Sequence, residues 1–283
     1  MKRKAVKFVI IIIELAAVLL AVMFIMMNHR EPGWHTIGNK EIYYADSSGR
    51  KATGYEIIDG KPYYFNWFGI PADKGWIEID GKLYYCTDNG ELATGWRYID
   101  GKAYYFYQKS DDKGEGSRGA AASDFTTAGG LYIPEAGYID GDEGKAIGYA
   151  VDVLNRFGWN LRSAYKYSSS LRFVSAPDEQ YGYRIHKCAL QGFEHGEGNC
   201  LAWSGSFCAM AKVLGYDCRL IWGSLRWKGE DHVHGWTEIW EADGIHVYDP
   251  RKNEGEDFAG FDVRYGQKGS YRYNEDSKTY LKW

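Results

Sequence analysis

The stretch "GEGNCLAWSGSFCAMAKVLG" (residues 196–215) predicts a buried helix that begins at a cysteine. Asn199 is a favoured residue for a helix N-cap, and Gly215 is suited to end the helix. Apolar residues occur on both sides of this helix, so we expect it to lie at the centre of a domain. One stripe of the helix carries Cys200, Trp203, Phe207, Met210 and Leu214.

Cys200 is a candidate nucleophile because of its place in this helix. The positive end of the helix dipole favours a thiolate, which is the nucleophilic form of cysteine. A thiolate nucleophile also needs a base, usually histidine, and a group that orients the base. A packed, unreactive thiol is the alternative.

The chain around this helix predicts an α+β domain that spans residues 131–283. Helical periodicity precedes the cysteine in "EGKAIGYAVDVLNRF", "LRSAYKYSSSLRFV" and "YRIHKCALQGF", and a period of two follows it in "CRLIWGSL", "HVHGWTEIWE" and "IHVYDP". Helices followed by antiparallel strands are typical of the α+β class.

His234 and Asp249 supply the missing base and orienting group. They lie on two consecutive predicted strands that an Asp-Gly pair separates. A two-residue loop would place Asp249 opposite Glu238, whereas a four-residue loop would place it opposite Trp236 and diagonal to His234. All three side chains share a face in both cases. A triad of Cys200, His234 and Asp249 predicts the wider loop.

These blocks together resemble the transglutaminase-like superfamily. The sequence has "GEGNC" before a helix, then "HGWTEIW", then "YDP", in the order and spacing of that family. The resemblance implies a papain-like fold, with Cys200 as nucleophile, His234 as general base and acid, and Asp249 as the orienting carboxylate. It also implies chemistry through a thioester, either amide hydrolysis or acyl transfer to an amine. We expect Trp236 and Glu238 to be structural neighbours of the site.

Several roles at the site stay open. The backbone N–H of Cys200 is the natural first oxyanion donor, and Gln191 or Tyr183 could supply a second. His232 is an alternative base. It could instead form a metal pair with His234, completed by Asp249 or Cys200. No cofactor or metal is expected.

The five cysteines do not predict a disulfide framework. An odd number leaves at least one thiol unpaired, and a domain of this size does not need such bridges. A bridge from Cys188 to Cys208 or Cys218 remains open. Cys86 completes the set.

Residues 31–108 contain a repeat with a period of about 21 residues. Each unit carries Gly and an aromatic residue, then a block such as "IDGKPYYF". Asp-Gly pairs favour hairpin turns and the Tyr-Tyr pairs favour strands. A single hairpin cannot bury its aromatic face, so we expect the hairpins to stack into a solenoid.

This stretch resembles the cell-wall-binding repeats of Gram-positive surface proteins, which include choline-binding modules. Where choline-binding versions put an aromatic residue before the Tyr-Tyr pair, this chain has Ile42, Pro62, Leu83 and Ala103. A glycan or other wall polymer is therefore expected in place of choline. The alternative is that the aromatic rings only fill the solenoid core. The candidate binding residues are Trp34, Tyr55, Trp76 and Trp96.

The two ends of the repeat have different compositions. Residues 109–130 are small, polar and Gly-rich, which predicts a flexible linker. Residues 1–30 predict a cytoplasmic stub and a transmembrane signal-anchor, because residues 8–27 are apolar apart from Glu14. Four basic residues precede the apolar run and place the remainder outside the cell. A cleaved signal peptide is the rival interpretation.

The exported part carries a net negative charge. Of the 34 Lys/Arg and 38 Asp/Glu residues, residues 1–30 hold five and one, so residues 31–283 hold 29 and 37. This balance of −8 argues against a nucleic acid partner. The sequence thus predicts a single-pass membrane protein with an extracellular enzyme acting on a protein or peptide amide. The alternative is a wall-binding surface protein whose transglutaminase-like domain is inactive.

Overall fold

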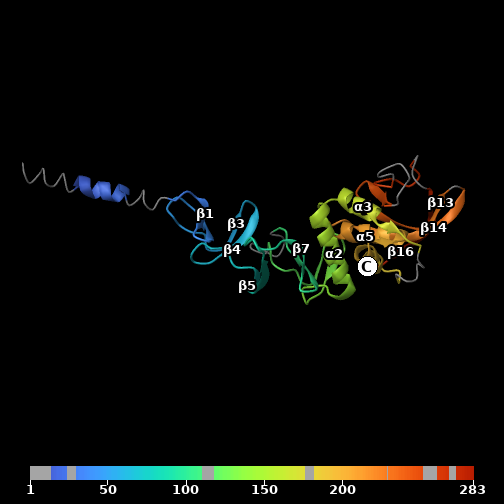
Figure 1. The fold of residues 1–283 in the computed structure, drawn as a ribbon, viewed down its shortest axis with the longest axis horizontal. Helices are drawn as coiled ribbons and strands as arrows, with labels where there is room; N and C mark the ends of the chain where they lie inside the picture. The colour runs from blue at the N-terminus through green and yellow to red at the C-terminus, as the bar shows by residue number, and fades with distance from the viewer. Residues whose placement is uncertain are drawn as a thin grey trace, which may run out of the picture. The chain divides into compact units, whose positions relative to one another are not determined.

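The computed structural model describes residues 14–23, 30–109, 118–175, 182–227, 229–250, 260–267 and 272–283. The chain divides into two units, which are considered separately. The first contains Met1–Ala93 and Ser110–Gly119, and the second contains Thr94–Lys109 and Ala120–Trp283. Figure 1 shows the elements of both units in chain order.

Among its described residues, the first unit contains three antiparallel hairpins in addition to the helical residues 14–23. Two of their tight turns use Asp-Gly pairs, whereas the first hairpin turns through Gly38-Asn39. In the second hairpin Asp59 has φ 50° and Gly60 has φ 75°. Two successive positive φ values define the turn that suits the twist of a two-residue hairpin. The hairpins pair β1 (Gly33–Ile37) with β2 (Lys40–Tyr44), β3 (Gly54–Ile58) with β4 (Lys61–Phe65), and β5 (Gly75–Ile79) with β6 (Lys82–Cys86).

Successive hairpins bury their aromatic faces against each other. The rings of Trp34 and Tyr63 have centroids 5.2 Å apart, and those of Tyr55 and Tyr84 lie 6.2 Å apart. Between hairpins, the Leu92 N–H donates to the Pro62 carbonyl at 2.8 Å. The predicted stacking of hairpins is therefore present.

The fourth hairpin belongs to the second unit. Strands β7 (Gly95–Ile99) and β8 (Lys102–Phe106) pack on helix α2 (Gly141–Phe157). A Cβ built on Gly148 would lie 2.6 Å from the Tyr98 ring, so this glycine permits the close approach. Ala103 and Ile139 exchange backbone hydrogen bonds of 2.8 and 2.9 Å. The second compact unit thus begins at Thr94, whereas the sequence places its start at residue 131.

The expected flexible linker at 109–130 is wrong for residues 118–130. Strand β9 (Phe125–Thr126) pairs with β10 (Tyr132–Ile133), and Ala121 bridges to Phe106. Ala122 and Ile133 are fully buried. The small residues that suggest flexibility instead let this segment pack closely.

Four helices and a four-stranded antiparallel sheet form the rest of the second unit (Figure 1). The helical and strand patterns of the sequence are confirmed, and a short parallel pair joins β11 (Arg172–Phe173) to β12 (Glu197–Gly198). The sheet has the order β15-β14-β13-β16, and the sequence did not predict β16. The other elements are α3 (Leu161–Ser170), α4 (Ile185–His195), α5 (Cys200–Val213), β13 (Cys218–Trp227), β14 (Glu230–Glu241), β15 (Gly244–Tyr248) and β16 (Arg272–Leu281).

Helix α5 is the centre of this unit, as expected. Every residue from Leu201 to Val213 is buried, and the helix contacts α2, α3, α4, β13 and β14. A separate apolar cluster on the sheet includes Ile221, Trp236 and Val247. The sheet therefore packs against α5 and also carries an apolar cluster of its own.

The β14–β15 hairpin has the register that the triad requires. Thr237 pairs with Tyr248, and continuing that register places Asp249 beside Trp236. The loop is nevertheless shorter than the predicted four residues, because Glu241 still pairs with Gly244. Only Ala242 and Asp243 remain in the loop.

Half of the predicted transmembrane span at 8–27 lies outside the described residues. Residues 14–23 are helical. Within the described ranges, no helix is both long and apolar enough to cross a membrane.

Phe207→Ala should destabilise the second unit strongly. Phe207 is 0% exposed, and its ring contacts Tyr165 and Tyr248 at centroid distances of 6.0 and 5.0 Å. Removing it leaves a cavity, and we expect a loss of about 3–5 kcal/mol in the free energy of unfolding, measured in denaturant. Phe157→Ala is the control, because Phe157 is 57% exposed. Equal losses in the two variants would contradict the central position of α5.

Candidate active site

The thiol of Cys200 stands at the N-terminus of α5. The Asn199 side chain caps this end and accepts hydrogen bonds from the N–H groups of Leu201 and Ala202 at 3.0 and 3.4 Å. Cys200 is partly exposed, whereas the other four cysteines are buried. The cap fixes the helix end, and the helix dipole favours an anion there.

Helix α5 is joined to β14 by two reciprocal hydrogen bonds next to the site. The Ser204 hydroxyl donates to the Gly235 carbonyl at 2.9 Å, and the Thr237 hydroxyl donates to the Ser204 carbonyl at 3.0 Å. A Cβ on Gly235 would lie 2.9 Å from a methyl carbon of Leu201, so the strand approaches the helix closely here. This contact sets the distance between the first turn of α5 and His234.

His234 lies between Cys200 and Asp249. Its Nε2 is 2.9 Å from Asp249 Oδ2, and its ring also forms a hydrogen bond with the Cys200 side chain. Because Nε2 faces the carboxylate, Nδ1 is the nitrogen that remains for the thiol. The Trp236 ring lies nearly parallel to the imidazole, with an interplanar angle of 17° and centroids 6.5 Å apart. The structure therefore brings the three predicted residues together in the predicted order.

The surroundings of His234 favour its protonated form. Burial lowers the pKa of His234, but the charge and hydrogen bond of Asp249, together with the Cys200 side chain, outweigh burial and raise this pKa to about 10. An imidazolium beside a sulfur atom stabilises a thiolate. The pair is thus arranged for nucleophilic attack by sulfur.

Two tyrosines that the sequence did not predict hold Asp249 in place. Tyr273 on β16 donates to Asp249 Oδ2 at 3.1 Å, and Tyr165 on α3 donates to the Asp249 carbonyl at 2.7 Å. The Asp249 N–H donates to the Gly260 carbonyl at 2.8 Å. Asp249 is 1% exposed, so the bonds from Tyr273 and His234 to its carboxylate compensate for the water that this group loses.

Trp236 and Glu238 support the site from the same face of β14, in agreement with their expected role. The fully buried Glu238 carboxylate forms an ion pair of 2.9 Å with Lys278. Glu238 also accepts hydrogen bonds from Tyr265 and from Trp240. Trp236 in turn donates to the Tyr265 hydroxyl at 2.8 Å. The strand that carries His234 is therefore fixed by paired polar groups.

The remaining candidates differ in their exposure and in their neighbours. His232 is exposed, and it is His234 that contacts Asp249. A Cβ on Gly198 would lie 3.5 Å from the Gln191 side chain, so Gln191 is close to the start of α5. Tyr183 has φ 50° and is exposed, with its ring 6.3 Å from that of Trp222. The geometry favours Gln191 over Tyr183 as a second oxyanion donor.

The disulfide from Cys188 to Cys208 or Cys218, which the sequence left open, is not formed in the structure, because all five cysteines are free. The close pair is Cys208 and Cys218, whose sulfur atoms lie 3.4 Å apart.

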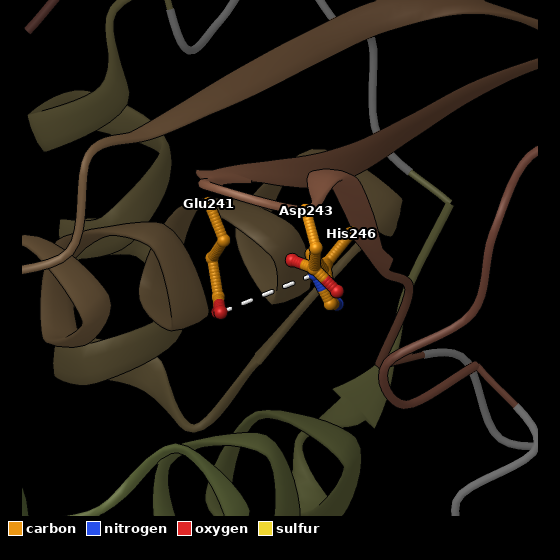
Figure 2. Close-up of side chains that lie close together, drawn as sticks. All are labelled: Glu241, Asp243 and His246. Carbon is orange, nitrogen blue, oxygen red and sulfur yellow. Dashed lines mark hydrogen bonds and ion pairs between the residues drawn. The ribbon is translucent and has the colours of Figure 1, made fainter.

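The metal pair of His232 and His234, which the sequence left open, is not a candidate cluster in the described part of the chain. Among the described residues, the cluster that could hold a cation is Glu241, Asp243 and His246 (Figure 2). His246 Nε2 lies 2.9 Å from Asp243, and Nδ1 lies 2.5 Å from Asp262. Burial lowers the pKa of His246, but these two carboxylates raise it overall. With Arg264 also bonded to Asp243 at 2.5 Å, the group forms a network of hydrogen bonds and ion pairs around His246.

The aromatic candidates of the repeats differ in exposure. Trp34 is exposed, whereas Trp96 is 2% exposed and packs edge-on against Tyr105. The Tyr55 hydroxyl donates to the Arg118 carbonyl at 3.0 Å, and Trp76 packs against Tyr85. The motif did not point to Trp67, which is 89% exposed beside the exposed Phe68. Two adjacent aromatic residues in a turn segment are the signal for this surface.

Comparison with known families agrees with both parts of the chain. Residues 155–250 match the family model of the transglutaminase-like superfamily, and residues 74–115 match the model of the choline-binding repeat. No curated protein matches the sequence. The chain combines a transglutaminase-like domain with choline-binding repeats.

Solved structures similar to this chain include choline-binding proteins and a cell wall endolysin. Choline binding protein F of Streptococcus pneumoniae is 30% identical over 38% of this chain and 33% of its own, with a TM-score of 0.30. The choline-binding domain of Spr1274 from Streptococcus pneumoniae is 32% identical over 23% of this chain and 98% of its own, with a TM-score of 0.22. The cell wall endolysin from phage Cp-1, complexed with choline, is 28% identical over 27% of this chain and 23% of its own, with a TM-score of 0.25. The chain thus covers about a third of choline binding protein F.

The transglutaminase-like match includes the three triad candidates but ends before β16. Cys200, His234 and Asp249 all lie within residues 155–250, whereas Tyr273 and Lys278 lie beyond them. Tyr273 and Lys278 of β16 contact Asp249 and Glu238. The motif blocks therefore do not contain this support.

Asp249→Asn should lower the pKa of His234 from about 10, because it removes the carboxylate charge while burial remains. Histidine NMR resonances followed through a pH titration would measure the change, with His234→Gln assigning the signal. In the parent, protonated His234 stabilises the fold fully below about pH 6.5, and this contribution is lost as pH rises through about 10. Asp243→Asn is the matched control, because it removes a carboxylate from His246 instead. An unchanged His234 titration in Asp249→Asn would contradict the assigned pair.

Proposed function

We propose that this protein is a cell-surface cysteine enzyme that forms a thioester with an amide substrate. The observation that carries the proposal is the continuous contact from Cys200 through His234 to Asp249 at the N-terminus of a buried helix. The transglutaminase-like match over this segment supports the same chemistry. The substrate class is a protein or peptide carrying a carboxamide or peptide carbonyl.

The proposed reaction begins with attack of the Cys200 thiolate on the amide carbonyl carbon. The new C–S bond converts the carbonyl oxygen into an oxyanion, which the Cys200 backbone N–H stabilises, with the Gln191 amide as second donor. As the C–N bond breaks, the His234 imidazolium gives its proton to the departing amine. A water molecule or a second amine then attacks the thioester, and neutral His234 takes its proton. The C–S bond breaks, which releases the acyl product and regenerates the Cys200 thiolate.

We propose that the repeats hold the enzyme on a wall polymer of a Gram-positive bacterium. The choline-binding family match and the exposed aromatic residues of the repeats support this role. The apolar run at 8–27 supports a single-pass membrane anchor with the remainder outside the cell. Two such attachments would raise the local concentration of enzyme at its substrate.

Cys200→Ala should abolish labelling by iodoacetamide at the active site and remove amide turnover. The assay combines a glutamine-containing peptide with a labelled primary amine and follows ammonia release and label incorporation. Incorporation of label identifies transfer, and ammonia without label identifies hydrolysis. We expect a loss of at least about 10³-fold, since the nucleophile has no replacement.

Cys188→Ala is the matched control, because Cys188 is fully buried on α4 and lies outside the triad. It should retain both labelling and turnover. If the parent protein shows no turnover and Cys200 reacts no faster than free cysteine, the enzyme proposal fails and the wall-binding alternative remains.

Trp67→Ser should reduce retention of the full chain on purified cell walls. Trp67 is 89% exposed, so its loss removes a contact surface without opening the hairpin core. We expect a weakening of about tenfold in a sedimentation assay with intact walls, as is typical of an aromatic contact residue. Trp240→Ser is the control, since Trp240 is partly exposed on β14 of the other unit. Equal retention of the two variants would argue against a binding role for this turn.

A further inference from the structure

The second unit contains a pocket that neither family match assigns. Its volume is about 430 Å³, which lies in the range of pockets for small ligands. The pocket lies where the strand β7 of the fourth hairpin meets the C-terminal end of α2. It is lined by Thr94, Gly95, Trp96, Arg97, Gln108, Asn155 and Trp159.

Trp159 provides the flat apolar surface of this pocket. It is 45% exposed, whereas Trp96 is only 2% exposed. The Trp159 indole N–H donates to Asn155 Oδ1 at 3.0 Å, which orients the ring from the last turn of α2. The indole face is therefore held in position before any ligand arrives.

Polar groups surround this aromatic face. Asn155 accepts from the indole through its oxygen, and this bond does not use its amide nitrogen. Gln108 lies against Gly95, where a Cβ would be 2.8 Å from the Gln108 amide nitrogen. Arg97 adds a guanidinium group, and none of the seven lining residues is acidic.

This chemistry distinguishes between two ligand classes. A quaternary ammonium group prefers aromatic faces without a neighbouring cation, and Arg97 would repel it. A sugar ring presents C–H groups to an aromatic face and hydroxyl or amide groups to donors and acceptors at its edge. The lining of this pocket matches the sugar.

We propose that this pocket binds one pyranose unit of a glycan, with Trp159 against the ring face and Asn155, Gln108 and Arg97 at its polar edge. The site belongs to the unit that carries Cys200, so it adds a second glycan contact to those of the first three repeats. It does not depend on catalysis by Cys200. It would hold a glycan strand on the same compact unit that carries the Cys200 thiol.

The test is fluorine NMR of the full chain labelled with 5-fluorotryptophan, titrated with tri-N-acetylchitotriose. Trp159→Phe assigns the Trp159 signal by its disappearance. We expect this signal to shift in a saturable manner, and to stay in place when choline chloride is added. A Trp159 signal that ignores the saccharide at saturating concentrations, or that moves only with choline, would overturn the proposal.

Variants separate this site from other contacts. Asn155→Ala should raise the dissociation constant for the saccharide, read from the Trp159 signal, by about fivefold to tenfold. The variant loses a hydrogen bond to the ligand and the bond that orients the indole. Phe157→Ala is the matched control, because Phe157 is an exposed aromatic residue on the same helix outside the pocket lining. Cys200→Ala should bind the saccharide normally even if the proposed amide chemistry fails. Equal affinities of Asn155→Ala and the parent, at equal thermal stability, would also overturn the proposal.

Discussion

The contact between the first turn of α5 and β14 is the constraint on which the site depends. Ser204 and Thr237 exchange hydrogen bonds with the facing backbone, and Gly235 has no side chain to separate the two elements. These bonds are buried, where an unpaired polar group costs about 1–3 kcal/mol, so alternative positions of the strand are unfavourable. Because His234 directly precedes Gly235, fixing the strand also fixes the imidazole beside the thiol.

The second requirement is that the buried Asp249 carboxylate has polar partners. Asp249 has lost nearly all contact with water, and an isolated charge in that position would be unstable. His234 supplies an opposite charge and Tyr273 a hydroxyl donor. Tyr165 and Gly260 engage its backbone, so α3 and the segment before Val263 also hold it. The orientation of the proposed base is thus determined by elements far apart in the chain.

Much of this site could be predicted because its signals are local. Asn199 before an apolar helix, His234 within a strand pattern and Asp249 after another are each visible in a short window. The roles of Tyr165 and Tyr273 could not be predicted, since they depend on how α3 and β16 pack against a distant strand end. The sequence also predicts too long a loop for the β14–β15 hairpin. Gly244, at φ 124°, continues the pairing in a conformation that other residues rarely adopt.

The repeat region shows why composition alone misplaces a domain boundary. The fourth hairpin has the same motif as the other three, yet Ala103 and Phe106 are fully buried in the second unit, and Gly148 of α2 receives the Tyr98 ring. The following small residues read as a linker, but Ala122 and Ile133 extend the same packed surface. A motif records how a hairpin turns, whereas its neighbours decide which core it joins. In this chain the last repeat joins the core of the transglutaminase-like unit, and the pocket beside Trp159 forms along that junction.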